Sequence, residues 1–172
     1  MSTLKVDTIQ HSGGTTGMTI DSSGRILQPA KPAFRARIAG SGSAQGKTGT
    51  LIFETEDFDI GGNYNLSTGI FTCPISGIYT FTFNALSAGS NTGSANVSND
   101  TPWGDFYKNG SILTGTRFYA YVNGGSFHAT FNATTILQLS ASDEIKVVIG
   151  AEYVYADTNA QYDPCFAGFL VS

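Results

Sequence analysis

The sequence predicts an all-β protein, and three observations lead to this prediction. The chain is rich in glycine and aromatic residues, with 21 glycines, 12 phenylalanines and 8 tyrosines, and only 13% of its residues are charged. This composition is typical of strands joined by many tight turns. From Tyr79 to Ala85 apolar and polar residues alternate, as they do in a strand with one buried face. Helix-forming patterns are absent from the chain.

Length and charge narrow the class of protein. A chain of 172 residues can form one domain with a hydrophobic core and an additional tail. The formal net charge of −4 and the pI near 4.9 disfavour nucleic acid and anionic membranes as partners. The apolar stretches are too short for a transmembrane helix, and the first residues lack the features of a secretory signal. We therefore expect a protein that is made and assembled in a cytoplasm, without membrane insertion.

Residues 1–32 are expected to form an extended segment. They contain short apolar pairs separated by turns, with too few apolar residues for a core of their own. The segment is therefore either a floppy leader or a structure that folds by pairing with copies of itself or with another surface. The apolar residues that suggest short strands are Leu4, Val6 and Ile9, then Met18 and Ile20, then Ile26 and Leu27.

Strands are expected to follow one another closely over residues 33–172, the second unit of the chain. A Gly/Ser-rich loop is expected at 40–50, and a long exposed loop at 87–101, which has almost no apolar residue. The expected strands are 34–38, 51–53, 63–72, 77–87, 103–108, 117–122, 126–137, 144–153 and 164–171.

Eight aromatic and turn residues recur at fixed intervals in the first half of this unit. The alternation predicts that the aromatic members share one buried sheet face. Pro74-Ile-Ser-Gly77 is typical of a turn, across which Phe71 is expected to pack from a neighbouring strand. These residues therefore indicate a scaffold and not a site. The eight are Phe53, Asp59, Tyr64, Phe71, Gly77, Tyr79, Phe81 and Phe83.

This spacing resembles the signature of the complement component 1q globular head, a ten-stranded jelly-roll sandwich of the tumour necrosis factor type. The resemblance covers most of residues 33–172, since 107–110 is similar to the family's mid-domain hairpin, 137–143 to its late turn and 166–170 to its closing strand. It implies that fold, and because the family consists of trimeric binding heads, it also implies a homotrimer without catalytic activity.

A second resemblance concerns the beginning of the chain. Leu-Lys-Val-Asp-Thr-Ile and Gly-Met-Thr-Ile-Asp, within residues 3–21, are similar to the leader of structural proteins of tailed phages, especially marine ones. There the leader attaches the protein to the particle or makes a fibre trimeric. The resemblance implies attachment to other virion proteins through Leu4, Val6, Ile9, Met18 and Ile20.

Two expected strands carry large side chains on both faces. A lone sandwich requires only one apolar face per strand, so the excess suggests burial between subunits. Aromatic residues packed under loops or under the tail would also account for it. The strands contain Phe118, Tyr119, Tyr121 and Val122, and Val147, Val148, Ile149, Tyr153 and Val154.

Residues with the chemistry of catalysis or metal binding are few. His11 lies in the leader, and His128 is out of phase with the apolar face of its strand. The densest acidic group suggests a solvated loop, with a calcium site or a glycosidase pair as alternatives. Without a cysteine–histidine cluster, no cofactor is expected. The acidic residues are Glu54, Glu56, Asp57 and Asp59.

Cys73 and Cys165 are the only cysteines. In a cytoplasm two free buried thiols are expected, whereas a disulfide would be the alternative in an extracellular protein.

Binding is better supported than catalysis. Trp103, the only tryptophan, follows the long loop, and 155–163 forms a second polar and aromatic loop. Rings can stack on sugar faces while amides and carboxylates bind hydroxyl groups, although a tryptophan at a strand entry is commonly packed. The candidate ligand-binding residues are Asn99, Asp100, Trp103 and Asp105, and Tyr155, Asp157, Asn159 and Tyr162.

These observations predict a non-enzymatic virion protein of a tailed phage. It would be a trimeric head, anchored by its N-terminal segment as a tail fibre, appendage or capsid decoration, and able to bind a host surface glycan. Two alternatives remain open: a surface-polysaccharide hydrolase, and a secreted cytokine-like or lectin-like trimeric head.

Overall fold

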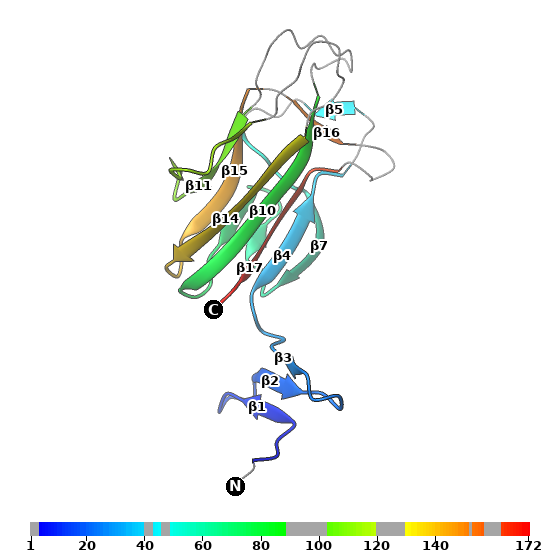
Figure 1. Ribbon diagram of the computed structural model, residues 1–172, viewed down its shortest axis with the longest axis vertical. Coiled ribbons are helices and arrows are strands. Elements are labelled where there is room, and N and C mark those ends of the chain that lie inside the picture. Colours follow the sequence, from blue (N-terminus) through cyan, green and yellow to red (C-terminus); the bar gives the residue numbers. More distant parts are fainter. Residues whose placement is uncertain are drawn as a thin grey trace.

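The computed structural model describes residues 4–39, 43–45, 49–88, 103–119, 130–151, 153–156 and 163–172. Its regular elements are strands, and none of the described residues forms a helix. Two sheets of seven strands each pack face to face, and a small three-stranded sheet of N-terminal residues lies beyond one end of them (Figure 1). The prediction of an all-β protein is therefore confirmed.

The first large sheet, called the β10 sheet, is built around the twelve-residue strand β10 (Gly77–Ala88). Antiparallel partners run along both sides of β10, and Figure 1 shows them side by side on the face toward the viewer. The other strands of this sheet are β4 (Ala33–Arg37), β5 (Ser43–Gln45), β7 (Thr55–Ile60), β14 (Thr130–Leu139), β16 (Tyr153–Ala156) and β17 (Cys165–Leu170).

The second large sheet, called the β11 sheet, centres on the antiparallel pair β11 (Trp103–Lys108) and β15 (Glu144–Ala151). Short strands extend it on both sides, so more strands are present in the sandwich than the ten that were expected. They are β6 (Gly49–Thr50), β8 (Tyr64–Asn65), β9 (Ile70–Thr72), β12 (Ser111–Ile112) and β13 (Phe118–Tyr119).

Aromatic side chains from both sheets make the core. Phe34 of the β10 sheet stacks on Tyr64 and Phe71 of the β11 sheet, with ring centroids 5.0 and 4.9 Å apart. The Phe166 ring meets Phe34 edge-on at 5.0 Å. All four rings are buried, and aromatic pairs of this kind contribute about 0.5–1.5 kcal/mol each beyond the burial of their area. Phe34 therefore joins the two layers of the sandwich.

The eight residues of the recurring pattern belong to this scaffold, as predicted. The aromatic members are buried, and Asp59 accepts a hydrogen bond at Oδ2 from the Tyr64 N–H at 2.7 Å. The expected hairpin at Pro74 is wrong, however, because β9 pairs with β15 and β10 belongs to the other sheet. Phe71 still contacts Phe81, with centroids 5.5 Å apart, across the core. The turn at Pro74 therefore carries the chain from one sheet to the other.

Strand boundaries differ from expectation in the region before Asp59. Residues 51–53 are not in a strand, although Leu51 N–H donates to the Val147 carbonyl at 3.0 Å and both Leu51 and Phe53 are buried. The expected loop at 40–50 contains β5 and β6. The acidic stretch expected as a loop forms β7, because its backbone pairs with β4 at the sheet edge.

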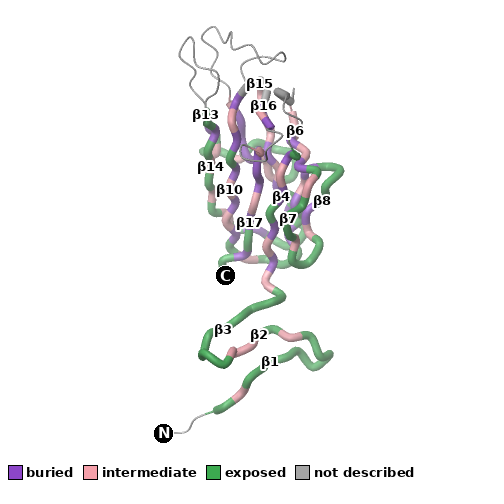
Figure 2. The backbone as a smooth tube through the Cα atoms, turned by 90° about the vertical axis from the view of Figure 1, so that its right-hand side faces the viewer, coloured by how far each residue is buried: buried purple, intermediate pink, exposed green. Residues whose placement is uncertain are grey.

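The N-terminal segment folds into its own sheet, β1 (Thr8–Gln10), β2 (Thr16–Ile20) and β3 (Ile26–Leu27). None of its residues 4–31 is buried, and Figure 2 shows this sheet in green and pink below the purple interior of the sandwich. The connection to the head is polar: Lys31 Nζ donates to the Val171 carbonyl at 2.7 Å, and Leu170 N–H donates to the Pro32 carbonyl at 3.0 Å.

Candidate binding surfaces

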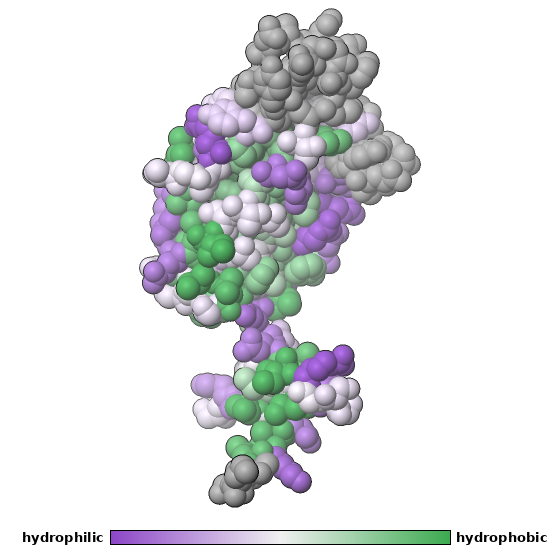
Figure 3. All heavy atoms as spheres, viewed as in Figure 1, coloured by the Kyte–Doolittle hydropathy of each residue, from purple (hydrophilic) through white to green (hydrophobic). Residues whose placement is uncertain are grey.

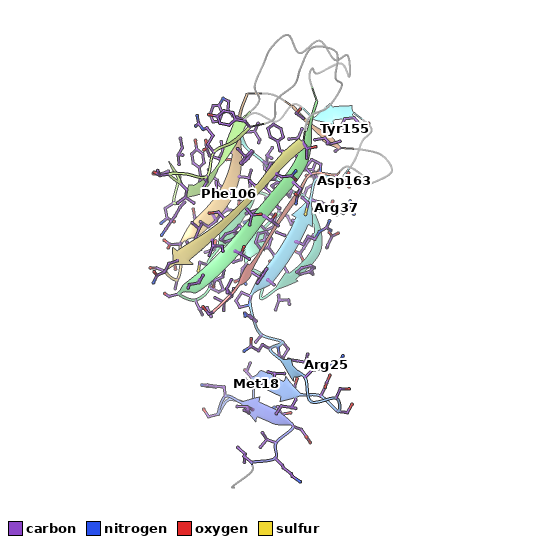
Figure 4. The ribbon with its side chains drawn as sticks, in the orientation of Figure 1. Met18, Arg25, Arg37, Phe106, Tyr155 and Asp163 are labelled. Carbon is purple, nitrogen blue, oxygen red and sulfur yellow. The ribbon has the colours of Figure 1, made fainter. Side chains whose placement is uncertain are left out.

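The structure describes three of the eight residues predicted to contact a ligand. Trp103 and Asp105 lie in β11, whereas Tyr155 lies in β16 of the other sheet, at the end of the sandwich away from the N-terminal sheet (Figure 4). The remaining five lie outside the described residues, so their predicted role stays a prediction. These five are Asn99, Asp100, Asp157, Asn159 and Tyr162.

Trp103 and Asp105 form a cluster with Arg117, which sequence reasoning had not selected. The Arg117 guanidinium lies 4.1 Å from the centroid of the Trp103 ring. Its Nη2 donates to Asp105 Oδ2 at 2.8 Å, and its Nε donates to the same oxygen at 3.1 Å. The Asp105 side chain is only 1% exposed, so it holds Arg117 and does not face open solvent.

The charges of this cluster compensate one another. A buried carboxylate is costly unless it is paired and hydrogen-bonded, and Arg117 provides both. Hydrogen bonding to Asp105 raises the pKa of Arg117, and a hydrogen bond with Tyr119 acts in the same direction. Arg117 therefore remains a cation, held over the ring of Trp103.

The Trp103 ring is packed on its own sheet as well. Gly150 in β15 lies against the indole, and a Cβ at that position would overlap ring atoms. The tryptophan is half-buried as a result. Arg117 and Gly150 thus contact the Trp103 ring, which the sequence analysis had predicted to stack on a sugar.

A second cation lies over an aromatic ring further along β11. Lys146 Nζ is 6.0 Å from the centroid of the Tyr107 ring, and these two residues are paired neighbours in β15 and β11. Both side chains are half-buried.

The outer face of the β10 sheet has the opposite character. The strands β14, β10 and β17, which are neighbours in this sheet, present no charged side chain to this face, whereas the next strand, β4, presents Arg35. Thr, Asn and Gln are interspersed with apolar residues on β14, β10 and β17. Ile136 is 69% exposed and Phe169 50% exposed. A shallow groove of about 380 Å³ is lined by Phe58, Thr80 and Ala167 among others. Figure 3 shows this face mostly in white and green.

Comparison with known proteins assigns the family. The family model described as "C1q domain" matches residues 33–171. The chain belongs to the C1q domain family. The expected jelly-roll sandwich of the complement 1q and tumour necrosis factor type is confirmed by the same comparison and by two solved structures. The globular domain of zebrafish complement 1qA has a TM-score of 0.60 with 22% identity, covering 83% of this chain and 98% of that one. Murine APRIL has a TM-score of 0.57 with 12% identity, covering 81% and 98%.

Among curated proteins, this C1q domain is similar to complement C1q tumor necrosis factor-related protein 5 of Rattus norvegicus and of Homo sapiens. Identity is 26% over 144 residues in both cases, covering 83% of this chain and 54% of the relative. The chain thus spans about half the length of these relatives. The resemblance of its first residues to phage leaders is outside what these comparisons show.

Two of the four acidic residues considered for calcium or glycoside hydrolysis, Asp57 and Asp59, are engaged in other contacts, whereas Glu54 and Glu56 are exposed. Asp57 forms ion pairs with Arg35 and Arg37, and Asp59 caps the backbone of Tyr64. Arg37 also pairs with Asp163 at 2.8 Å, and both residues are labelled in Figure 4. In the part of the chain that the structure describes, no group of three metal-binding side chains is present. His128 lies outside the described residues.

The two cysteines of the C1q domain are buried and unpaired, as expected. Burial raises the pKa of the Cys165 thiol, while the nearby Arg35 acts against this rise. Neither thiol is therefore expected to be reactive.

The residues predicted for particle attachment lie in or beside the N-terminal sheet. Leu4 is 83% exposed and Ile9 is also exposed, whereas Val6, Met18 and Ile20 are half-buried. Figure 4 shows Met18 in this small sheet, apart from the core residue Phe106. None of the described residues lies in a helix of the length and apolar character needed to cross a bilayer.

Proposed function

We propose that this C1q domain is a non-catalytic, homotrimeric binding head, attached to a larger particle through its N-terminal sheet. The observation that supports it best is the uncharged outer face of β10, β14 and β17 in the β10 sheet. Exposed Phe58, Ile136 and Phe169 lie on the outer face of this sheet. The charged side chain that lines the groove there is Arg35 of β4. Exposed apolar side chains that gather on one face are typical of a subunit interface, and we assign this face to contacts with a second and third copy of the chain.

The absence of catalysis is proposed from the same geometry. A hydrolase requires a nucleophile with a base, or two carboxylates free to act. In β7, Asp57 pairs with arginine, Asp59 accepts a hydrogen bond from the Tyr64 backbone, and Glu56 is exposed. We therefore propose that these carboxylates have a structural role. Binding of a host surface glycan remains the proposed activity of the head.

The particle that we propose is the virion of a tailed phage, assembled in the host cytoplasm. The support is the leader resemblance of residues 3–21, together with the exposed apolar residues Leu4, Ile9, Ile26 and Leu27 of a sheet without buried side chains. Three short strands need a buried hydrophobic face for independent stability, and this sheet has no buried side chain. Contact with a particle would cover them.

A secreted head is the second candidate. It is favoured by the similarity to complement C1q tumor necrosis factor-related protein 5 of rat and human. Gradient-purified phage particles and cell-free medium of the producing culture separate the two candidates. Recovery of the chain with the particles, detected by mass spectrometry, supports the virion role, and recovery as a free trimer in the medium supports the secreted role.

The trimer itself is tested by light scattering on the full chain and two variants. We expect a mass of about three times 18.1 kDa for the natural chain, and a single-chain mass for Ile136→Asp and Phe169→Asp, since a buried unpaired charge opposes assembly. Ile112→Asp is the matched control, because Ile112 is apolar and 49% exposed, close to the 50% of Phe169, but lies in β12 of the other sheet. A monomeric natural chain would overturn the proposal.

A further inference from the structure

The N-terminal sheet has one face made of aliphatic side chains. Ile9 is paired with Met18, and Ile20 with Ile26, and residues paired directly across two strands point to the same side of a sheet. Met18 and Ile20 also share a side, because they are two residues apart in β2. These four residues are called the aliphatic face.

The opposite face of this sheet is more polar. Thr8 is paired with Thr19, and Thr19 with Leu27, so these three side chains point away from the aliphatic face. The N-terminal sheet is therefore amphipathic. Such a pattern is typical of a sheet that is covered by another layer on one side and solvated on the other.

The described chain leaves the aliphatic face largely uncovered. Ile9 is 50% exposed and Ile26 is 62% exposed, and Met18 and Ile20 are half-buried. A three-stranded sheet needs a buried hydrophobic face for independent stability. The missing layer must therefore come from outside the single chain.

Apolar residues of the N-terminal sheet and of the proposed trimer interface are visible from the same side of the molecule. Figure 3, viewed toward the β10 sheet, shows hydrophobic residues in green on both parts. The chain passes from the N-terminal sheet directly into β4 of the β10 sheet, and the Pro32 carbonyl accepts a hydrogen bond from Leu170 N–H of β17. Three heads that assemble through the β10 sheet therefore bring three N-terminal sheets close together.

The lack of charge favours copies of the same chain as the covering layer. None of the residues in β1, β2 and β3 is charged, and Asp21 and Arg25, in the turn after β2, pair with each other at 2.6 Å. In a closed trimer, side chains near the three-fold axis lie beside their own copies, so a charge there would face like charges. The outer face of β10, β14 and β17 is uncharged as well, so both surfaces can meet copies of themselves without this repulsion.

We propose that the aliphatic face packs against the same face of two further copies, so that three N-terminal sheets form a foot beneath the trimeric head. Each sheet gains from its copies the layer that a single chain lacks. Leu4 and Leu27 lie outside the aliphatic face and remain for the proposed contact with the particle. The inference rests on the proposed trimer and names the surface that extends it into the N-terminal segment.

Cysteine variants at adjacent positions of β2 test the foot. Met18→Cys places a thiol on the aliphatic face, and Thr19→Cys places one on the opposite face; both positions are half-buried in the single chain. The full-length variants are treated with a bismaleimide that reaches about 8 Å, since packed sheets lie about 10 Å apart. Cys73 and Cys165 are buried, and the natural chain measures any reaction at these thiols.

We expect cross-linked pairs of chains from Met18→Cys, with a yield at least roughly fivefold above that from Thr19→Cys, because thiols held within one assembly have a high effective concentration. For the same reason the yield should not change when the protein is diluted, as long as it remains trimeric. Denaturing electrophoresis measures the yield. Ile9→Cys and Thr8→Cys repeat the comparison in β1, where both positions are exposed, so the result does not depend on one substitution.

Three outcomes would overturn the inference: equal yields from the two faces, a yield that falls on dilution, or a trimer without cross-links. The last of these would assign the aliphatic face to a component of the particle. Light scattering on the same samples separates the foot from the proposed function. A trimer without cross-links leaves the trimeric head standing, whereas a monomeric natural chain removes the head and the foot together.

Discussion

Trp103 is packed closely against Arg117 and Gly150. The indole packs against Gly150 of β15, and the Arg117 guanidinium lies over the ring. Glycine is required at residue 150 for space, since a side chain would overlap the indole. The cluster is therefore as much a packing unit as an electrostatic one.

Gly150→Ala tests this packing. The added methyl displaces the ring, and we expect a loss of about 1–3 kcal/mol in unfolding free energy, as for other overpacked sites. Because Trp103 is the only tryptophan, its emission shifts to longer wavelength as it becomes hydrated. Gly17→Ala is the control, since a Cβ there meets only an ordinary contact. Unchanged emission and stability in Gly150→Ala would contradict the packing described.

Asp143 has a comparable role in the turn between β14 and β15. Its carboxylate pairs with Lys108 at 2.7 Å, and accepts hydrogen bonds from the Asn109 side chain at 2.8 Å and from the Ser140 N–H at 2.7 Å. The contact with Lys108, followed by those with Asn109 and Ser140, lowers the pKa of Asp143 to about 2. The carboxylate therefore stays ionised in the folded protein well below the pH at which it protonates in the unfolded chain.

The expected consequence is a loss of stability in acid. A lowered folded-state pKa contributes stability above the unfolded value of about 3.9. That contribution disappears as the pH falls toward about 2, the folded value. Asp143→Asn should be less stable than the natural chain at pH 7, and the difference should shrink between about pH 4 and pH 2. Urea unfolding at several pH values measures it; a difference that is constant with pH would contradict the assignment.

At the scale of elements, the turn at Pro74 decides how the strands are divided between the layers. Phe71 and Phe81 meet across the core from different sheets, with Phe34 stacked on Phe71. The alternation of apolar and polar residues predicts which face of each strand is buried. The same alternation is expected whether two consecutive strands pair in one sheet or lie in opposite sheets of the sandwich. The layers are therefore held together by rings that come from distant parts of the chain.

Phe34→Ala and Phe58→Ala separate core packing from surface packing. Phe34 is buried and contacts rings of both sheets, so its truncation is expected to cost about 3–5 kcal/mol. Phe58 is exposed on the outer face of the β10 sheet. Its truncation should leave the fold of one chain unchanged and weaken only the proposed trimer. Denaturant unfolding at one fixed protein concentration, together with light scattering, measures both effects. Equal losses of stability would contradict this distinction.

At the scale of the whole molecule, the chain divides into a well-packed head and a thin N-terminal sheet. The boundary at residues 32 and 33 remains a prediction, although the family model begins at residue 33. The described contacts that join the two parts include hydrogen bonds of Lys31 and of Pro32 with the last residues of β17 and beyond. Such a junction contributes little to the stability of the head.

Removal of residues 1–32 tests this division. We expect the shortened chain to unfold cooperatively, within about 1 kcal/mol of the full chain, since no buried side chain of residues 4–31 is lost. Its mass by light scattering shows whether the head trimerises alone. Lys31→Met in the full chain is the control for the single hydrogen bond to the Val171 carbonyl. An unfolded or aggregated shortened chain would show that the N-terminal sheet is part of the head.

Several features of the protein could be predicted from the order of residues along the chain alone. The alternation of Tyr79, Phe81 and Phe83 predicted a buried strand face, and the wider spacing resembled one jelly-roll family, because pleated strands repeat every two residues wherever they lie. The buried thiols of Cys73 and Cys165 were also expected from the sequence. These properties depend on neighbours along the chain.

Other features were decided by tertiary structure. Arg117 meets Asp105 and Trp103 only because β13 and β15 pair on both sides of β11. Asp57 reaches Arg35 and Arg37 only because its stretch forms an edge strand against β4. The uncharged outer face of β10, β14 and β17 joins residues 50 or more positions apart, such as Thr80 and Ile136. Such sites depend on which strands become neighbours. The packing of the core determines these neighbours, and the spacing of residues along the sequence does not predict them.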